Sequence, residues 1–264
     1  MRVNLRKSLF ILPNLFTLSS VFCGLYAIVL CSGDNSSVRD DDFYRASLLI
    51  IFAMFFDTID GRVARLTRTQ SAFGLQLDSL ADVIAFGAAP AVLVYRWALE
   101  PLGLIAVIGC FAFTACAAIR LARFNVISMS PAGAPKKPDK YILGLPTPGA
   151  AGILVSLVAA NHAVAGGLSS TPVPILIVVV ALAIFMVSTI RFRSLKDLRL
   201  SWRTMLLVGF ALGSSIVLAL KLHIAFALGW LLVSYVAIGL VESILSVTRR
   251  AARARKPRED ERAI

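Results

Sequence analysis

The chain has 264 residues, 58% of them hydrophobic, and a mean hydropathy of +0.81. Soluble domains of this length are closer to half apolar, so the composition excludes an ordinary soluble domain and indicates a membrane protein. The formal net charge of +12 does not indicate nucleic-acid binding, because the basic residues lie between long apolar runs, where such residues set membrane topology.

Eight apolar runs follow one another along the chain, each near the roughly 20 residues that a helix needs to cross the hydrocarbon. They cover residues 9–31, 44–60, 73–95, 101–121, 148–166, 172–190, 204–220 and 223–246. The first run is too long for a signal peptide, and no clear cleavage site follows it. We therefore predict an all-α integral membrane protein with about eight transmembrane helices over residues 1–248. A charged, disordered tail is predicted over residues 249–264.

The basic residues predict the orientation of these helices. Eight spans place both termini on one side of the membrane, and the cytoplasmic side carries the excess of Lys and Arg. With the N-terminus in the cytoplasm, all but four of the 27 Lys and Arg residues fall in cytoplasmic segments. The four outer ones are Arg39, Arg45, Arg96 and Lys221. We expect a protein of the cell membrane with both termini in the cytoplasm.

Two pairs of aspartates flank the connection between the second and third runs. Asp57 and Asp60 are three residues apart at the end of the second run, and Asp78 and Asp82 are four apart near the start of the third. Both spacings put the pair on one face of a helix. The connection is short, so the two helices are antiparallel neighbours and their acidic faces can meet. Four converging carboxylates need cations between them, and we predict two divalent ions, Mg²⁺ or Mn²⁺.

Acidic residues at these positions can also arise without a catalytic metal. In one alternative, the aspartates only pair with the arginines at the membrane surface, which are Arg62, Arg65 and Arg68. In another, the chain is a cation transporter, but transport sites lie near the bilayer midplane, whereas these acids lie at the cytoplasmic edge. Four acids near a membrane are costly and usually functional, so we favour a metal site.

The same stretch carries a longer pattern, Asp57-x2-Asp60-Gly61-x2-Ala64-Arg65-x8-Gly74-x3-Asp78-x3-Asp82. It resembles the signature of the CDP-alcohol phosphotransferase family at every defined position. The resemblance implies a helical bundle whose enzyme breaks a CDP-linked alcohol at its pyrophosphate, releases CMP and joins the phosphoalcohol to an acceptor hydroxyl. It further implies that the four aspartates bind the metal ions, that Asp82 also removes the acceptor proton, and that the enzyme forms a homodimer.

The resemblance also implies a binding site for the CDP-linked lipid. Its predicted residues are Asn14, Thr17, Gly61, Ala64, Arg65, Ser71 and Gly74. Asn14 and Thr17 belong to the segment PNLFT, which resembles a Pro-Asn-x-x-Thr element of the family near the nucleotide. Purely structural roles remain open for these residues. In particular, Asn14 and Thr17 can instead be polar residues that join two helices by hydrogen bonds.

Two further segments suggest the acceptor. RLARFN, residues 120–125, and GLPTP, residues 144–148, resemble the phosphatidylserine synthase branch of the family. The resemblance implies CDP-diacylglycerol and L-serine as substrates. Arg120 and Arg123 can bind a carboxylate, and Asn125 an ammonium or hydroxyl group. GLPTP is predicted to form a re-entrant turn beside the site. Glycerol 3-phosphate or inositol remains an alternative acceptor, and a purely topological role remains open for both arginines.

Overall fold

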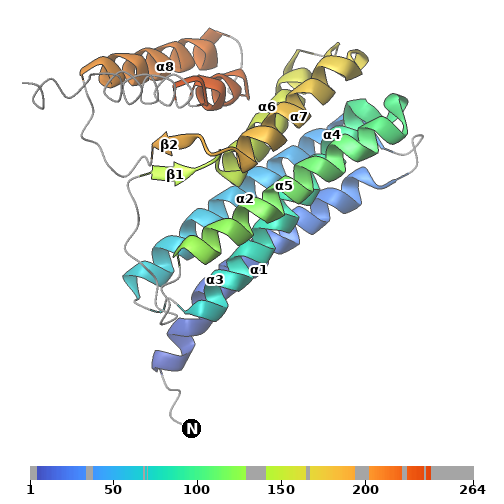
Figure 1. Ribbon diagram of the computed structural model, residues 1–264. Helices are drawn as coiled ribbons and strands as arrows, with labels where there is room; N and C mark the ends of the chain where they lie inside the picture. Colours follow the sequence, from blue (N-terminus) through green and yellow to red (C-terminus); the bar gives the residue numbers. More distant parts are fainter. Residues whose placement is uncertain are drawn as a thin grey trace, which may run out of the picture.

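The structure is a computed structural model of the chain (Figure 1). It describes residues 5–33, 38–67, 69, 71–128, 141–164, 167–193, 202–221, 225–234 and 236–238. The predicted tail at 249–264 and the end of the eighth run lie outside the described residues.

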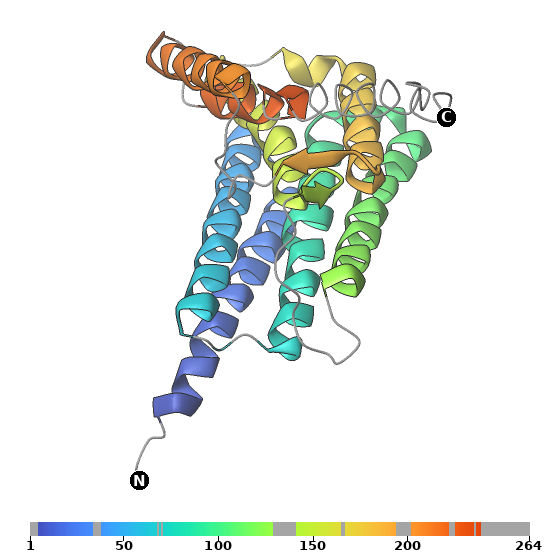
Figure 2. The same cartoon turned by 60° about the vertical axis from the view of Figure 1, so that its left-hand side comes forward.

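Four long helical segments form the main bundle. These are α1 (Leu5–Cys31), α2 (Asp40–Leu66), a continuous rod that begins with α3 (Ala72–Asp82), and α5 (Leu104–Ser128). The rod continues without a break through η1 (Val83–Ala88), α4 (Ala89–Val94), η2 (Tyr95–Leu99) and η3 (Glu100–Leu102). The four segments lie side by side, and α2 ends and α3 begins at the same end of the bundle as the N-terminus (Figures 1 and 2).

Local chemistry explains the connection between α2 and α3. Helix α2 runs to Leu66, six residues beyond the predicted end at residue 60, so Asp57 and Asp60 lie inside it. Helix α3 begins after Ser71, whose Oγ accepts a hydrogen bond from the Gly74 N–H at 3.0 Å and caps the helix. Because so few residues separate the two helices, both acidic pairs are held near one end of the bundle.

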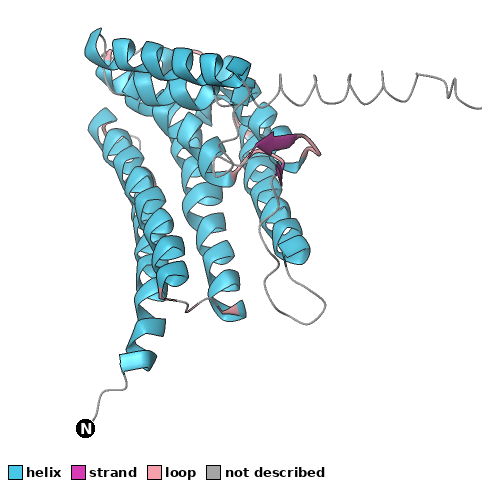
Figure 3. Ribbon diagram, turned by 90° about the vertical axis from the view of Figure 1, so that its left-hand side faces the viewer, coloured by secondary structure: helices cyan, strands magenta, loops and turns pink. Residues whose placement is uncertain are grey.

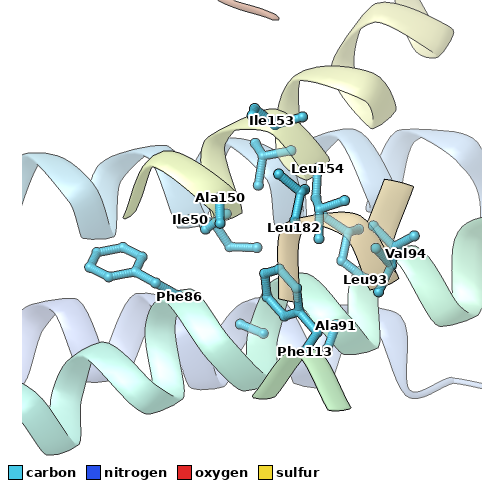
Figure 4. Close-up of a cluster of buried hydrophobic side chains, with 14 of the residues drawn as sticks. Ile50, Phe86, Ala91, Leu93, Val94, Phe113, Ala150, Ile153, Leu154 and Leu182 are labelled. Atoms are coloured by element: carbon cyan, nitrogen blue, oxygen red, sulfur yellow. The ribbon is translucent and has the colours of Figure 1, made fainter. Parts of the chain in front are cut away.

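The core of the bundle lies between the helices, away from the acidic pairs. Large buried side chains from four different elements belong to one hydrophobic cluster. Among them are Ile50, Phe86, Phe113 and Leu154 (Figure 4). Helix α1 approaches the rod closely at Gly24, where an added Cβ would lie 2.8 Å from the Ala85 Cα. The outer faces of the long helices are apolar, as a lipid environment requires.

Two shorter helices and a pair of strands cover one side of the bundle. Helix α6 (Thr147–Ala163) and helix α7 (Pro172–Val187) are joined through η4 (Leu168–Ser170). Strand β1 (Tyr141–Leu143) pairs antiparallel with β2 (Arg191–Arg193), Tyr141 opposite Arg193. The strands lie part-way along α5, so α6 starts inside the length of the bundle (Figure 2). The chain bends at Gly144, within GLPTP, just before α6, and the predicted re-entrance of this turn stays a prediction.

The helical fold class is confirmed, with differences in detail. Where the chain is described, each of the eight predicted runs is mostly helical. Within the part of the chain that the structure describes, three helices are long and apolar enough to cross a membrane: Leu12–Cys31, Ala72–Leu102 and Leu104–Ile127. Helices α6 and α7, with 17 and 16 residues, are shorter than a full span. Helix α8 (Trp202–Lys221) runs across the bundle, whereas the sequence predicts a span over residues 204–220 (Figures 2 and 3). The two short strands, β1 and β2, were not predicted.

Candidate active site

Three of the four predicted aspartates converge. One carboxylate oxygen from each of Asp57, Asp60 and Asp78 lies within 4.8 Å of the other two. Asp60 is buried, and the other two are partly buried. The predicted meeting of the acidic faces of α2 and α3 is therefore present in the structure. We call these three residues the carboxylate cluster.

Asp82 lies beside the carboxylate cluster, at the last residue of α3. Its side chain is buried, and its carboxyl group interacts electrostatically with those of Asp57, Asp60 and Asp78. It is also close enough to Arg120 for the two charges to interact. Two ionised carboxylates in contact require a proton or a cation between them. Asp82 thus joins the carboxylate cluster to a buried arginine on α5.

The carboxylate cluster has the donors that a hard divalent cation prefers. Oxygen ligands at this separation suit Mg²⁺ or Mn²⁺. Among the described residues, no Lys or Arg forms an ion pair with Asp57, Asp60 or Asp78. Arg62 is exposed, the Arg65 Nε donates to the backbone oxygen of Gly61 at 2.7 Å, and Arg68 lies outside the described residues. Pairing with Arg62 or Arg65 therefore does not explain the acids.

Thr17 on α1 contacts the carboxylate cluster directly. Its Oγ1 lies 2.7 Å from the Oδ2 of Asp60 and 3.1 Å from the backbone oxygen of Pro13, and it can donate to either. Both Thr17 and Asp60 are buried. The contact agrees with the alternative in which a polar residue joins two helices. It also fixes one oxygen of a candidate metal ligand.

The other predicted lipid-site residues form two groups near this end of the bundle. Asn14, Ser71 and Gly74 meet at the start of α3, where an added Cβ at Gly74 would lie 3.2 Å from the Ser71 Oγ and 3.8 Å from the Asn14 Oδ1. Gly61 and Arg65 lie in the last turns of α2, next to partly buried Ala64. An added Cβ at Gly61 would meet only the Arg65 Nη2, at 3.9 Å, among the described residues. Packing between helices therefore does not require glycine at position 61.

Residues of the RLARFN segment contact different neighbours. Arg120 is buried, and its Nη1 donates to the Thr147 Oγ1 at 2.9 Å. The buried Asn125 donates through Nδ2 to the Ser79 Oγ at 2.8 Å, which ties α5 to α3. Arg123 instead donates to the backbone oxygens of Val187 and Ser188, at 3.1 and 3.2 Å. Arg120 thus links α5 to α6 and Asn125 links α5 to α3, whereas Arg123 holds the end of α7. The acceptor-binding roles of all three residues stay predictions.

Comparison with known proteins decides the family. The sequence profile of CDP-alcohol phosphatidyltransferases matches residues 10–185, a stretch that contains every site residue described above. The chain belongs to the CDP-alcohol phosphatidyltransferase family. It is therefore a membrane-embedded transferase.

Relatives within the family share a named activity. A CDP-diacylglycerol–serine O-phosphatidyltransferase of Helicobacter pylori is 36% identical over 201 residues, which cover 76% of this chain and 79% of that protein. The protein of that name in Bacillus subtilis is 31% identical over 185 residues, covering 70% and 91%. The one in Saccharomyces cerevisiae is 36% identical over 138 residues, covering 52% and 49%.

Sequence reasoning missed two features of this transferase site. The sequence places Thr147 in a turn and does not reveal its contact with Arg120. Ser79 lies one residue after Asp78 and faces α5, where it accepts the hydrogen bond of Asn125. Ser79 could have been singled out from the sequence by its position. It is next to Asp78 and one turn before Asp82, on a short polar stretch of an otherwise apolar run.

Proposed function

We propose that this enzyme transfers the phosphatidyl group of CDP-diacylglycerol to the hydroxyl of L-serine, giving phosphatidylserine and CMP. The observation that carries the proposal is the buried Arg120, whose guanidinium charge interacts with the carboxyl group of Asp82. A buried arginine can bind the carboxylate of an amino acid by a charge-assisted, two-pronged hydrogen bond. The names of the Helicobacter pylori and Bacillus subtilis relatives support the same acceptor.

Asp57, Asp60 and Asp78 are proposed to hold divalent metal, with Asp82 completing a site for two ions. When bound, the metal supplies positive charge that offsets the pyrophosphate and stabilises the departing CMP. Mg²⁺ and Mn²⁺ both suit such carboxylate oxygens. The separation of the three oxygens supports this assignment.

Asp82 is proposed to accept the proton of the serine hydroxyl. The serine Oγ then forms a bond to the phosphorus that carries diacylglycerol, and the bond from that phosphorus to the bridging oxygen breaks. The bridging oxygen and its electron pair leave with CMP. Asp82 suits this step because its carboxyl group interacts both with the carboxylate cluster and with Arg120. A serine whose carboxylate pairs with Arg120 would keep its hydroxyl near both groups, which is the proximity that acid–base catalysis requires.

The CDP end of the donor is proposed to lie along the last turns of α2 and the first turn of α3. Gly61 and Ala64 leave room beside the helix, and the exposed Arg65 offers charge to phosphate oxygens. Asn14, Ser71 and Gly74 provide polar groups at the start of α3. For Thr17 we propose a different role, in which its hydroxyl orients Asp60.

Arg120 and Asn125 are the proposed acceptor residues. The guanidinium of Arg123 is used on the backbone oxygens of Val187 and Ser188, so we assign it to the scaffold. A phosphorylated acceptor such as glycerol 3-phosphate would need a denser cluster of basic groups than Arg120 alone, and inositol has no carboxylate for Arg120 to bind. These considerations favour serine over both alternatives.

A comparison of acceptors tests the proposal. Purified enzyme is supplied with CDP-diacylglycerol and Mg²⁺ or Mn²⁺, and CMP release is measured with L-serine, glycerol 3-phosphate or inositol. Serine is expected to release CMP, and the other two are expected to give only background. Strong release with inositol or glycerol 3-phosphate, and none with serine, would reject the serine assignment and leave the family assignment intact.

The active site is proposed to face the cytoplasm, because it lies at the same end of the bundle as the start of α1 and as Arg62 and Arg65 in the last turns of α2 (Figure 2). A reporter fused after Ile264 is expected to give a cytoplasmic signal, and one inserted at Ser36 a signal from the opposite side. The same signal from both positions would contradict this topology. The homodimer implied by resemblance stays a prediction.

Replacing Thr17 with Val is expected to weaken metal binding by roughly 10- to 100-fold, the usual effect of losing a group that orients a metal ligand. The exchange keeps the shape of the side chain but removes the hydrogen bond to Asp60. Mn²⁺ binding to the purified protein, followed by electron paramagnetic resonance, and the metal concentration for half-maximal CMP release should shift together.

Two variants control this experiment. Thr17→Ser retains the hydroxyl and should bind metal nearly as the parent does. Ser19→Ala removes a hydroxyl of α1 that donates only to the Leu15 backbone oxygen, and should change neither quantity. Suppose instead that Thr17→Val leaves the Mn²⁺ affinity unaltered and raises the Michaelis constant for CDP-diacylglycerol. That result would contradict the metal-orienting role and support the lipid-binding role predicted from the sequence.

A further inference from the structure

Thr147 is a buried residue with no role in the proposed mechanism. It is the first residue of α6, and its side chain is 0% exposed. Pro146 precedes it at the N-cap position and provides no side-chain hydrogen bond to the helix. The Thr147 hydroxyl instead accepts the hydrogen bond from the Arg120 Nη1 at 2.9 Å, across 27 residues of sequence. Its partner is therefore one of the two residues proposed above to bind the acceptor.

The turn before α6 fixes the position of Thr147. Gly144 has a φ of +75°, and an added Cβ there would clash with the backbone oxygen of Met186. The Gly144 N–H donates to the Ile190 backbone oxygen at 2.9 Å, and the Leu145 N–H donates to that of Phe185 at 3.0 Å. These contacts anchor the turn to the end of α7. The position of the Thr147 hydroxyl is thus set by backbone contacts between this turn and the end of α7.

The hydrogen bond to Thr147 gives the Arg120 guanidinium a partner whose position is fixed. An arginine side chain has four rotatable bonds and loses about 2 kcal/mol of rotamer freedom when it is ordered. The nearby negative charge of Asp82 attracts the guanidinium. A hydrogen bond to one terminal nitrogen fixes the plane of the group and limits how far it can move toward Asp82. Orientation matters here, because a carboxylate is recognised by two parallel N–H groups of a planar fork.

We propose that Thr147 is a positioning residue that sets the affinity of the enzyme for its acceptor by orienting Arg120. The inference rests on the proposed function, since it takes the carboxylate of serine as the group that Arg120 binds. It gives the GLPTP segment a second role, because the turn that fixes the start of α6 also places the hydroxyl on Arg120.

Kinetics of Thr147→Val test the proposal. The exchange preserves the volume of the side chain and removes the acceptor oxygen. The Michaelis constant for L-serine is expected to rise by about tenfold, the lower end for losing a hydrogen bond to a charged group. The Michaelis constant for CDP-diacylglycerol and the Mn²⁺ affinity should stay within about twofold of the parent. Thr147→Ser restores the hydroxyl and should restore the serine constant.

A double-mutant cycle separates positioning from general packing. If Thr147 acts through Arg120, Arg120→Ala combined with Thr147→Val should be no worse for serine than Arg120→Ala alone. Ser156→Ala is the matched control, because Ser156 is a buried hydroxyl of α6 that donates to the Ile153 backbone oxygen of its own helix. It should leave both Michaelis constants unchanged. Thr147→Ala replaces Thr147→Val if thermal melting shows that the valine variant does not fold.

The outcomes distinguish this inference from the proposed function. A parent enzyme that releases CMP with serine, together with a Thr147→Val variant that has parental Michaelis constants, would overturn the positioning role alone. Equal rises in the Michaelis constants for serine and CDP-diacylglycerol would also overturn it, as would additive effects of the two substitutions in the cycle. Either result would make Thr147 a packing residue. A parent enzyme without serine-dependent CMP release would reject the proposed function and this inference together.

Discussion

Replacing Asp78 with Asn is expected to lower the rate of CMP release by at least about 100-fold, the low end for losing a group that stabilises the transition state electrostatically. The exchange keeps the size of the side chain but removes one of three negative charges whose oxygens lie within 4.8 Å of one another. The same loss is expected for Asp57→Asn and Asp60→Asn. CMP release by purified variants, with Mn²⁺ binding measured in parallel, provides the test.

A matched control comes from the other end of the bundle. Asp41 lies in the first turn of α2 and is exposed, so Asp41→Asn should have nearly parental activity. Chelator should abolish the activity of the parent enzyme, and added Mg²⁺ or Mn²⁺ should restore it. Full activity in an excess of chelator, or a parental rate in Asp78→Asn, would rule out the proposed metal site.

Arg120→Ala is expected to raise the Michaelis constant for L-serine by about 10- to 150-fold, which corresponds to roughly 1.5–3 kcal/mol for a charged hydrogen-bond partner. The Michaelis constant for CDP-diacylglycerol should change far less. The reason is that Arg120 is buried on α5 near Asp82, on the side of the carboxylate cluster where the acceptor is proposed to bind. Initial rates over a grid of both substrate concentrations separate the two constants.

Arg123→Ala is the control for this prediction, because it removes an arginine three residues away on the same helix. Its guanidinium donates to the backbone oxygens of Val187 and Ser188, so its loss should lower thermal stability and leave the ratio of the two Michaelis constants unchanged. Equal rises for both substrates in Arg120→Ala would instead assign Arg120 to the donor phosphate or to the scaffold.

The carboxylate cluster could be predicted because its residues lie close together in the sequence. Asp57 and Asp60, like Asp78 and Asp82, are separated by less than two helical turns, and the short connection holds both pairs at one end of the bundle, where α1 packs against both helices. Hydropathy likewise identified the helical runs. It did not predict that α6 and α7 are shorter than a full span or that α8 runs across the bundle, because apolar composition indicates burial or lipid contact and not direction.

The partners of individual polar side chains could not be predicted in this way. Thr17 bonds to Asp60 across 43 residues, and Arg123 bonds to the end of α7 across more than 60. Helical periodicity gives the face on which a residue lies, but the neighbour of that face depends on how the helices pack. For this reason Arg120 and Arg123, which look equivalent in RLARFN, have different contacts in the fold.

Isotope transfer tests the central claim, attack by the serine hydroxyl on the phosphatidyl phosphorus, most directly. Purified enzyme is supplied with metal, CDP-diacylglycerol and L-serine labelled with ¹⁸O in the side-chain hydroxyl, and the products are identified by mass spectrometry. The account predicts phosphatidylserine that retains the heavy oxygen in its phosphodiester, together with unlabelled CMP. Heavy oxygen in CMP, or CMP release without labelled phosphatidylserine, would contradict it.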